Sequence, residues 1–304
     1  MSANLTGLKI AVLGGDDREL VLIPELMKLG ALVSVAGFPP RPELANARLI
    51  ETVEAAIHGV DAIILPMPGI DASGNIRAVY ATRKLALTEE IVRQIPADTP
   101  IIIGVARPIL REWANKYRLH LIEIAEMDEV AILNSVPSAE GAIQIAMEEL
   151  PITIHSSQAF VLGFGRTGKT LARMLQGIGA HTTVVARKKA DLARIWEMGF
   201  RGLTFTELTQ YIQEAEIIFN TVPAMVLDEE ILRKVNREAL IVDLASTPGG
   251  TDFLAAERLG IKAILAPGLP GKVAPKTAGL ILARVIPPLI VREVARAQKR
   301  LLFS

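Results

Sequence analysis

Short, uninterrupted apolar runs recur along the whole 304-residue chain and alternate with longer amphipathic stretches. Each run is too short to be a helix and ends at glycine, proline or a polar residue, as in Lys9–Leu13 and Ala159–Leu162. Strands that are apolar on both faces are typical of parallel sheets with helices on either side. The pattern therefore predicts an α/β protein with two doubly wound parallel-sheet domains.

The domain boundaries follow from where this pattern restarts. We expect residues 1–142 with 282–304 to form one domain, and residues 143–281 to form the other. A helix over Ser138–Glu149 is expected between them. The amphipathic stretch Thr277–Leu302 is expected to be helical, with a break at Pro287-Pro288, and to cross back onto the first domain.

The composition excludes several classes of function. The formal net charge is +0, whereas nucleic-acid binders usually carry a basic excess. The absence of cysteine excludes disulfides, zinc–thiolate sites and thiol nucleophiles, and it favours a cytoplasmic location. We expect no signal peptide, no membrane span and no metal site, because no segment is apolar enough and no acidic or histidine cluster has ligand spacing.

A glycine-rich turn is the most specific cofactor signal. The apolar run Ala159–Leu162 is followed by a G-x-G-x-x-G motif and then by an amphipathic helix. In this context the first glycine allows the tight turn, the second lets the backbone approach a pyrophosphate, and the third allows close helix–strand packing. A purely structural turn is the alternative. The expected cofactor-binding residues here are Gly163, Phe164, Gly165, Arg166, Thr167 and Gly168.

Basic residues follow the next predicted strand, where NAD-binding proteins usually place an acidic residue for the ribose 2′-hydroxyl. Arg187 and Lys188 stand there, and a guanidinium binds a 2′-phosphate well, so NADP is favoured over NAD. Residues 143–281 are therefore expected to form an NADP-binding Rossmann domain, and the other domain is expected to bind the substrate and to carry the catalytic residues. A solvated basic strand end is the alternative. Two further loops after strands are expected near the nicotinamide, with ordinary loop chemistry as the alternative: Thr221, Val222 and Pro223, and then Leu244 and Ala245.

Candidate substrate-binding residues lie at the predicted carboxyl ends of strands and in nearby loops. Ser135 or Ser138 is expected to cap the connecting helix with Pro137 in its first turn, which would also suit a substrate carboxylate. Plain capping is the alternative for these serines, and a solvated loop is the alternative for the lysines. The substrate-binding candidates are Arg18, Arg107, Ser138, Lys272 and Thr277.

The first glycine turn and the histidines are weaker candidates for functional sites. The turn Gly14-Gly15-Asp16 also follows a strand, but it lacks the third glycine and is not expected to hold a nucleotide. No histidine follows His181, which argues against a D-specific 2-hydroxyacid dehydrogenase with a late catalytic histidine. His155 is more simply structural than catalytic.

Longer motifs give a resemblance over nearly the whole chain. The sequence resembles the A subunits of the dipicolinate synthases of spore-forming bacteria. The segments that carry the resemblance are Leu5–Val12 with Gly14-Gly15-Asp16, Asn134–Pro137 with Glu140-Gly141, Gly163–Gly168, Asp243–Ser246 with Pro248–Asp252, and Ala266–Gly271 with Val273–Gly279. Lys188-Lys189 departs from the small polar residues of relatives and strengthens the NADP prediction.

The resemblance implies oxidation of a dihydro form of dipicolinate, or its hydroxy-tetrahydro hydrate, with NADP⁺ as acceptor. It also implies a lysine-branch dicarboxylate substrate, the dipicolinate synthase B subunit as partner and a location in the mother cell during sporulation; a homo-oligomer is expected as well. The candidate catalytic residues are Glu140, Lys276 and Ser135. The alternatives are another NADP-dependent dehydrogenase of an amino or keto acid, or a non-catalytic NADP-binding sensor.

Overall fold

The computed structural model describes the backbone of residues 3–303 and the side chains of residues 3–299. The chain divides into two compact units. The first unit contains the residues up to Ala131 together with those from Pro275 onward, and the second unit is Ile132–Ala274. The boundaries expected from the sequence, after residues 142 and 281, lie within the helices that join the units, whereas the two units divide after Ala131 and after Ala274. Each unit contains a six-stranded sheet, and each is described by itself.

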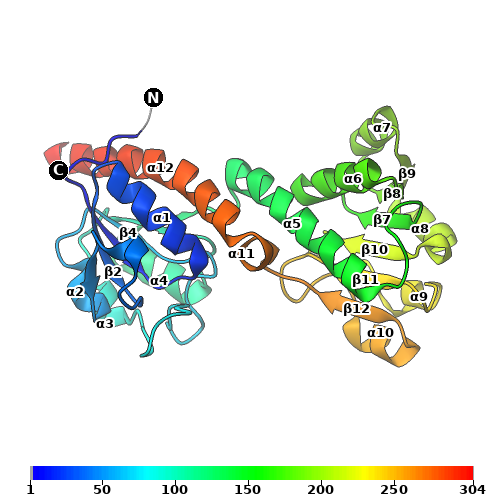
Figure 1. The fold of residues 1–304 in the computed structure, drawn as a ribbon. Coiled ribbons are helices and arrows are strands. Elements are labelled where there is room, and N and C mark those ends of the chain that lie inside the picture. Colours follow the sequence, from blue (N-terminus) through cyan, green and yellow to red (C-terminus); the bar gives the residue numbers. More distant parts are fainter. Residues whose placement is uncertain (1–2, 304) are drawn as a thin grey trace. The chain divides into compact units, whose positions relative to one another are not determined.

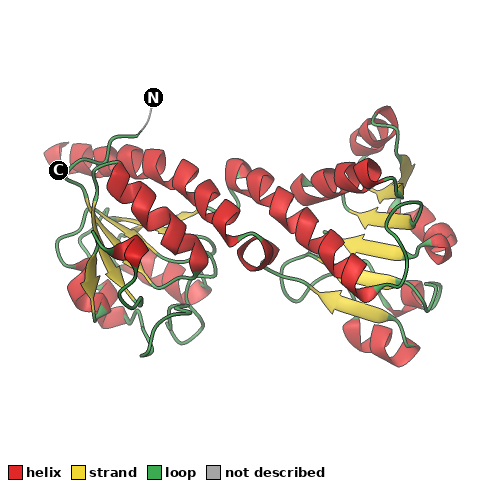
Figure 2. Ribbon diagram, viewed as in Figure 1, coloured by secondary structure: helices red, strands yellow, loops and turns green. Residues whose placement is uncertain are grey.

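The first unit has the strand order β3-β2-β1-β4-β5-β6, and all neighbouring strands pair in parallel. Helices flank both faces of this sheet (Figures 1 and 2). Its strands are β1 (Lys9–Leu13), β2 (Leu32–Ala36), β3 (Arg48–Ile50), β4 (Ala62–Ile64), β5 (Pro100–Ile103) and β6 (His120–Glu123). Its helices are α1 (Asp17–Lys28), η1 (Pro42–Leu44), α2 (Val53–Ile57), α3 (Glu89–Val92), α4 (Pro108–Lys116) and α12 (Pro275–Phe303).

The second unit repeats the same topology, because its order β12-β11-β10-β7-β8-β9 also places the first strand beside both the second and the fourth. This is the order of dinucleotide-binding folds. Its strands are β7 (Gln158–Leu162), β8 (His181–Val185), β9 (Arg201–Leu203), β10 (Ile217–Asn220), β11 (Leu240–Asp243) and β12 (Lys262–Leu265). Its helices are α6 (Arg166–Ile178), α7 (Lys189–Glu197), α8 (Phe205–Tyr211), η2 (Ile212–Glu214), α9 (Glu229–Leu232), α10 (Phe253–Leu259) and α11 (Leu269–Val273), and α5 (Asp128–Glu149) enters it from the first unit.

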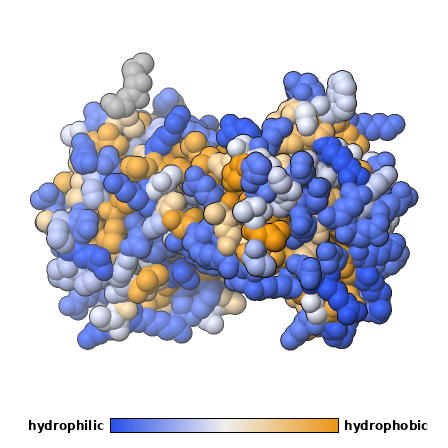
Figure 3. All heavy atoms as spheres, turned by 45° about the vertical axis from the view of Figure 1, so that its right-hand side comes forward, coloured by the Kyte–Doolittle hydropathy of each residue, from blue (hydrophilic) through white to orange (hydrophobic). Residues whose placement is uncertain are grey.

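The cores confirm the prediction of sheets that are buried on both faces. In β1, Ile10 and Val12 pack into one cluster while Ala11 and Leu13 pack into the other. In β7, alternate residues likewise divide between two clusters. Successive side chains of a strand point to opposite faces, so a sheet with helices on both sides needs an apolar residue at every position. On the face drawn in Figure 3, hydrophilic side chains predominate and hydrophobic atoms are exposed in smaller areas.

Two expectations about helices are wrong. The connecting helix begins at Asp128, well before Ser138, so Pro137 lies inside α5. The last helix, α12, runs from Pro275 to Phe303 and contains Pro287 and Pro288 without a break. Residues on both sides of these prolines belong to one core cluster, among them Val285 and Leu289. Burial of that continuous apolar face outweighs the cost of the two missing N–H groups.

Helix α12 packs closely against α1 at Gly279. A Cβ added at Gly279 would lie 2.6 Å from the Cβ of Val21 and 2.7 Å from the carbonyl oxygen of Arg18. Those atoms belong to α1, which packs along α12 in the first unit (Figure 1). Gly177 in α6 is the natural contrast, because a Cβ there meets nothing within 4 Å.

We expect Gly279→Ala to lower the free energy of unfolding by ~1–3 kcal/mol, because the methyl group overpacks the contact between α1 and α12. Gly177→Ala is the matched control and should raise it by up to ~1 kcal/mol through helix propensity. Urea denaturation followed by circular dichroism measures both. Equal, stabilising effects of the two substitutions would contradict the close packing.

Candidate functional site

The turn after β7 leaves the start of α6 open. Gly163 has φ 97°, in the left-handed region, and turns the chain sharply away from the strand. Gly165 is the N-cap residue of α6, and no side chain caps the helix among the described residues. A Cβ at Gly165 would meet nothing within 4 Å. A helix N-terminus with uncapped N–H groups attracts anions, so this turn fits the pyrophosphate of a dinucleotide.

Backbone crowding explains the other two glycines of the turn. A Cβ at Gly168 would lie 2.1 Å from the carbonyl oxygen of Gly163, which only glycine avoids. A Cβ at Gly163 would lie 2.5 Å from Oγ1 of Thr221, in the loop after β10. The Thr221 hydroxyl donates a hydrogen bond of 2.9 Å to the carbonyl oxygen of Leu162. The turn, the helix and the neighbouring loop are thus packed against one another.

Two buried polar residues at strand ends shape the adjacent loops, and sequence reasoning did not select them. The Asp243 side chain is fully buried and accepts hydrogen bonds from the N–H of Ala245 (3.0 Å), the N–H of Gly250 (2.8 Å) and the hydroxyl of Thr251 (2.7 Å). Asn220, also fully buried, binds both the N–H and the carbonyl oxygen of Val222. The signal was present in the sequence: a polar residue as the last residue of an otherwise apolar strand.

The two basic candidates for the 2′-phosphate follow β8. Arg187 and Lys188 are both exposed, and Lys188 is the N-cap residue of α7. Within residues 3–303, neither side chain takes part in a hydrogen bond or an ion pair. Their charges are therefore not neutralised by the protein itself. Nearer the glycine turn, the ammonium group of Lys169 lies 5.1 Å from the ring centroid of the buried Phe164.

The glycine turn of the first unit is closed by the chain itself. The N–H of Gly15 donates to the carbonyl oxygen of Arg77 (2.8 Å), and the N–H of Val79 donates to that of Gly15 (2.9 Å). The N–H of Asp16 donates to Oε2 of Glu19 at 2.7 Å. This helix start is therefore occupied by a carboxylate and by the segment around Arg77, where the corresponding turn of the second unit is open.

Three charged residues at this closed turn, Asp16, Arg18 and Glu19, interact closely with one another. The Arg18 guanidinium is buried and donates two hydrogen bonds of 2.8 Å to the Asp16 carboxylate. Burial raises the pKa of Asp16, but the hydrogen bonds and charge of Arg18 outweigh it and the net pKa is lowered. Burial raises the pKa of Glu19 to about 7, against the opposing charge of Arg18. Glu19 is therefore partly protonated near neutral pH.

The candidate substrate residues are distributed between the units. Arg18, Arg107, Lys276 and Thr277 belong to the first unit, and Lys272, Ser135, Ser138 and Glu140 belong to the second. Arg107 is the exposed N-cap residue of α4, and Lys272, Lys276 and Thr277 are exposed near the start of α12. The stretch from Pro267 to Thr277 contains α11 and the start of α12. Arg18 already binds Asp16 inside the same unit.

The expected serine caps are wrong, because both serines lie inside α5. The Ser138 hydroxyl donates to the carbonyl oxygen of Asn134 at 2.8 Å, and that of Ser135 lies 2.6 Å from the carbonyl oxygen of Ile132. Such bonds to the preceding turn are typical of serine within a helix. Ser135 also lies 2.6 Å from the hydroxyl of Thr170 in α6 and is buried. A helix-end anion site at these serines is therefore excluded.

Two other candidate side chains lie at different places in the second unit. Glu140 is exposed and lines a groove between α5 and α6 together with Met147 and Ile178. His155 precedes β7 and lies beside Gly179, at the end of α6. Ligands bind at the carboxyl ends of parallel strands, whereas His155 is at the amino end of its strand. Its position favours the structural interpretation.

Residues 3–303 contain neither a candidate membrane span nor a candidate metal site. No helix in this range is long and apolar enough to cross a membrane. No group of three or more histidine, aspartate or glutamate side chains in it is arranged to hold a metal ion.

Comparison with known proteins assigns a family to each half of the chain. Residues 9–125 match the N-terminal domain of the dipicolinate synthase A subunit, and residues 138–248 match the NAD-binding domain of D-isomer specific 2-hydroxyacid dehydrogenases. The dipicolinate synthase A subunit of Bacillus subtilis (strain 168) is 41% identical over 296 residues, covering 97% of this chain and 100% of that protein.

Solved structures agree with this assignment. The crystal structure of the dipicolinate synthase A subunit from Bacillus halodurans has a TM-score of 0.92 and 38% identity, over 94% of this chain and 99% of that chain. The corresponding Bacillus subtilis structure has a TM-score of 0.91 and 41% identity, over 97% and 99%. A transhydrogenase from Sinorhizobium meliloti, at 15% identity and a TM-score of 0.67, shares the fold alone.

The buried Glu19 gives a pH-dependent prediction. Its pKa in the folded protein is about 7, above its ordinary value of 4.5, so the folded state binds the extra proton between these pH values. The free energy of unfolding of the wild type therefore falls by up to ~3 kcal/mol as the pH rises from below 4.5 to above 7, because Glu19 loses its proton in the folded protein. Glu19→Gln should remove that loss, so the variant gains stability relative to wild type on going from pH 4.5 to pH 8.

Urea denaturation at the two pH values measures this difference. Glu90→Gln, at an exposed position of α3, is the matched control and should show no such pH-dependent gain. If Glu19→Gln behaves like the control, the Glu19 carboxyl group is not protonated in the folded protein.

Proposed function

This chain belongs to the family of dipicolinate synthase A subunits, and we propose that it oxidises dihydrodipicolinate, or its hydroxy-tetrahydro hydrate, to dipicolinate with NADP⁺ as acceptor. The match of its second unit to an NAD-binding dehydrogenase domain makes it an oxidoreductase with a nicotinamide cofactor. The observation that carries the choice of NADP is the pair Arg187 and Lys188. Both cations follow β8 with no partner within the described part of the chain.

The cofactor turn fits a dinucleotide because its helix start is open and its crowded positions are glycines. The cofactor would supply the hydride acceptor. Arg187 and Lys188 would hold its 2′-phosphate, and Gly163–Gly168 would lie against its pyrophosphate. The loops at Thr221–Pro223 and Leu244–Ala245 would contact its nicotinamide end. These loops are held in place by the hydrogen bonds of Asn220 and Asp243.

The overall reaction balances without a further reactant. Dihydrodipicolinate loses a hydride from one ring carbon and a proton from another position, and the product is the aromatic pyridine dicarboxylate. If the hydrate enters, one water molecule is lost before the oxidation. A base must take the proton, and Glu140 and Lys276 are the candidate proton-transfer groups. Both side chains are exposed.

The remaining candidates have binding or positioning roles in this proposal. Arg107, Lys272 and Thr277 are exposed donors for the carboxylates of the substrate. Arg18 is held by Asp16, so it contributes its remaining N–H donors and fixes the closed turn. Ser135 is buried against Thr170 and positions α5 on α6. Ser138, bonded to its own helix, is the weakest of the set.

Membership of this family also suggests which other protein this chain binds. An A subunit implies a B subunit, and we propose that this chain works with the B subunit of a dipicolinate synthase, in the cytoplasm of the mother cell during sporulation. Assembly of this chain with copies of itself is part of the same proposal.

The decisive experiment follows NADP⁺ reduction at the nicotinamide absorbance. The aldol-derived lysine-pathway intermediate is the substrate, and the assay is run with and without the B subunit. We expect reduction of NADP⁺ coupled to the appearance of dipicolinate. Cofactor binding without reduction in either case would favour a sensor. Turnover of an amino or keto acid alone would favour another dehydrogenase.

Cofactor choice is tested by binding, independently of turnover. Arg187→Ala should weaken NADP⁺ binding by ~10- to 100-fold, because a charge-assisted bidentate contact is lost, and should leave NAD⁺ binding nearly unchanged. Arg194→Ala, an exposed arginine of α7 paired with Glu197, is the control. Titration calorimetry with both dinucleotides measures the change. Parallel losses for NADP⁺ and NAD⁺ would contradict recognition of the 2′-phosphate.

The proton-transfer candidates are separated by conservative substitutions. The two variants are Glu140→Gln and Lys276→Met. The variant that removes the proton-transfer group should have a kcat lower by ~100-fold or more, with KM and NADP⁺ binding little changed. The other variant should retain most of the activity. Steady-state kinetics across the pH range measures both, and full activity of a variant removes that residue from the mechanism.

A further inference from the structure

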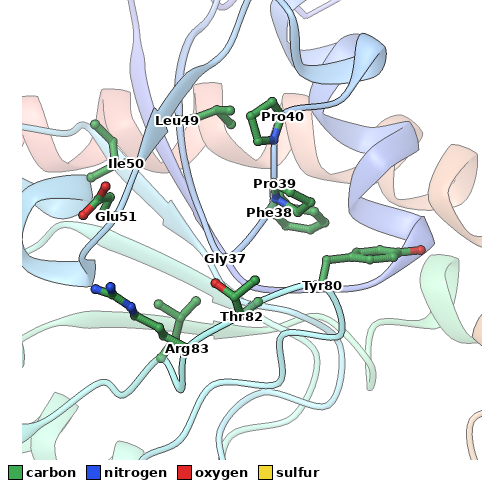
Figure 4. Close-up of a pocket in the computed structure, with 12 residues that line it drawn as sticks. Gly37, Phe38, Pro39, Pro40, Leu49, Ile50, Glu51, Tyr80, Thr82 and Arg83 are labelled. Atoms are coloured by element: carbon green, nitrogen blue, oxygen red, sulfur yellow. The ribbon is translucent and has the colours of Figure 1, made fainter.

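The first unit contains a pocket that the proposed reaction does not use. Its volume is ≈ 430 Å³, and it lies at the carboxyl ends of β2 and β3. Three segments form it: the residues after β2, the end of β3, and the stretch from Tyr80 to Leu85 (Figure 4). The volume is within the usual range for small-molecule sites, and open α/β sheets bind ligands at this edge.

One wall of the pocket is apolar and preformed. Phe38 is only 9% exposed, and Pro39 and Pro40 continue this wall (Figure 4). Gly37 turns the chain with φ 94°, and a Cβ there would lie 2.5 Å from Cδ1 of Leu85. Proline rings and a glycine-dependent turn restrict the backbone, so this wall needs little reorganisation when a ligand binds.

The Tyr80 ring is fixed at the edge of the same wall. Its centroid lies 5.8 Å from that of Phe38, and the Arg41 guanidinium lies 4.1 Å from it on the ring face. The Tyr80 hydroxyl donates a hydrogen bond to Asp17 at the start of α1. These contacts hold the aromatic side of the pocket in one arrangement.

The opposite side carries one charge of each sign. Figure 4 shows Glu51 and Arg83 on the same side of the pocket, with their charged ends turned toward one another. Both are exposed, and within residues 3–303 neither forms a hydrogen bond or an ion pair. A ligand with only one charge would place that charge beside a group of its own sign. A ligand with an ammonium and a carboxylate satisfies both side chains.

We propose that this pocket binds a free α-amino acid with an apolar side chain. The ligand ammonium binds Glu51, its carboxylate binds Arg83, and its side chain packs on the wall formed by Phe38, Pro39 and Pro40. None of the pocket residues belongs to the candidate residues for cofactor or substrate, so the amino-acid site stands independently of the proposed reaction.

The test uses L-phenylalanine and L-leucine as probes in calorimetric titrations of the full chain. Saturable binding is expected for at least one of them. N-acetyl-L-phenylalanine lacks the ammonium and phenylalaninamide lacks the carboxylate, so each should bind at least ~10-fold more weakly than phenylalanine. Adenosine monophosphate is included, because the end of β2 is where nucleotide-binding sheets contact a ribose.

Two variants assign the two charges. Arg83→Gln should weaken phenylalanine binding by ~10-fold or more and leave the weaker binding of phenylalaninamide unchanged. Glu51→Gln should weaken phenylalanine binding similarly and leave N-acetyl-phenylalanine unchanged. Glu54→Gln and Arg93→Gln, at exposed positions of α2 and at the end of α3, are the matched controls and should bind like wild type. Because all four positions are on the surface, we expect the variants to fold, and circular dichroism confirms it.

Three results would overturn the proposal. The first is that neither phenylalanine nor leucine binds saturably at millimolar concentration. The second is amino-acid binding that survives in the Glu51→Gln, Arg83→Gln double variant. The third is tighter binding of adenosine monophosphate that needs Arg83 and not Glu51, which would assign a nucleotide to the pocket instead.

Discussion

The fully buried carboxylate of Asp243 holds together the ligand-binding edge of the second sheet. A buried charge is costly unless hydrogen bonds satisfy it, and here two backbone N–H groups and a hydroxyl do so. Because these donors come from positions 245, 250 and 251, the loop after β11 has one arrangement. Gly250 then approaches Asn220, whose hydrogen bonds fix the loop after β10. These contacts join the loop after β11 to the loop after β10, and the loop after β10 packs against Gly163 of the glycine turn.

The two units share one strand order but differ at the first turn. In the second unit the helix start is uncapped and open, as anion binding requires. In the first unit the same place is filled by the Glu19 carboxylate and by the backbone around Arg77. The same topology therefore gives one helix start that is open to an anion and one that the chain itself fills.

Much of this architecture could be predicted from the sequence, because apolar runs with turn residues at their ends indicate buried parallel strands. The cofactor turn could be predicted because three glycines were required at fixed spacing. The start of α5 was missed because Pro137 suggested a first turn, whereas tertiary packing keeps the proline inside the helix. The pairing of Arg18 with Asp16 was also missed, since sequence shows which charges exist but not which of them the fold has already neutralised.

The return of α12 to the first unit has a consequence for how the chain is made. The core of the first unit includes Leu282, Ile286 and Ile290, which are synthesised only after the entire second unit. During translation the second unit is therefore complete while the first still lacks one wall of its core. Until α12 is synthesised, the surface of the amino-terminal sheet that it later covers stays exposed to water. This sheet is therefore the part of the nascent chain that most needs protection from aggregation.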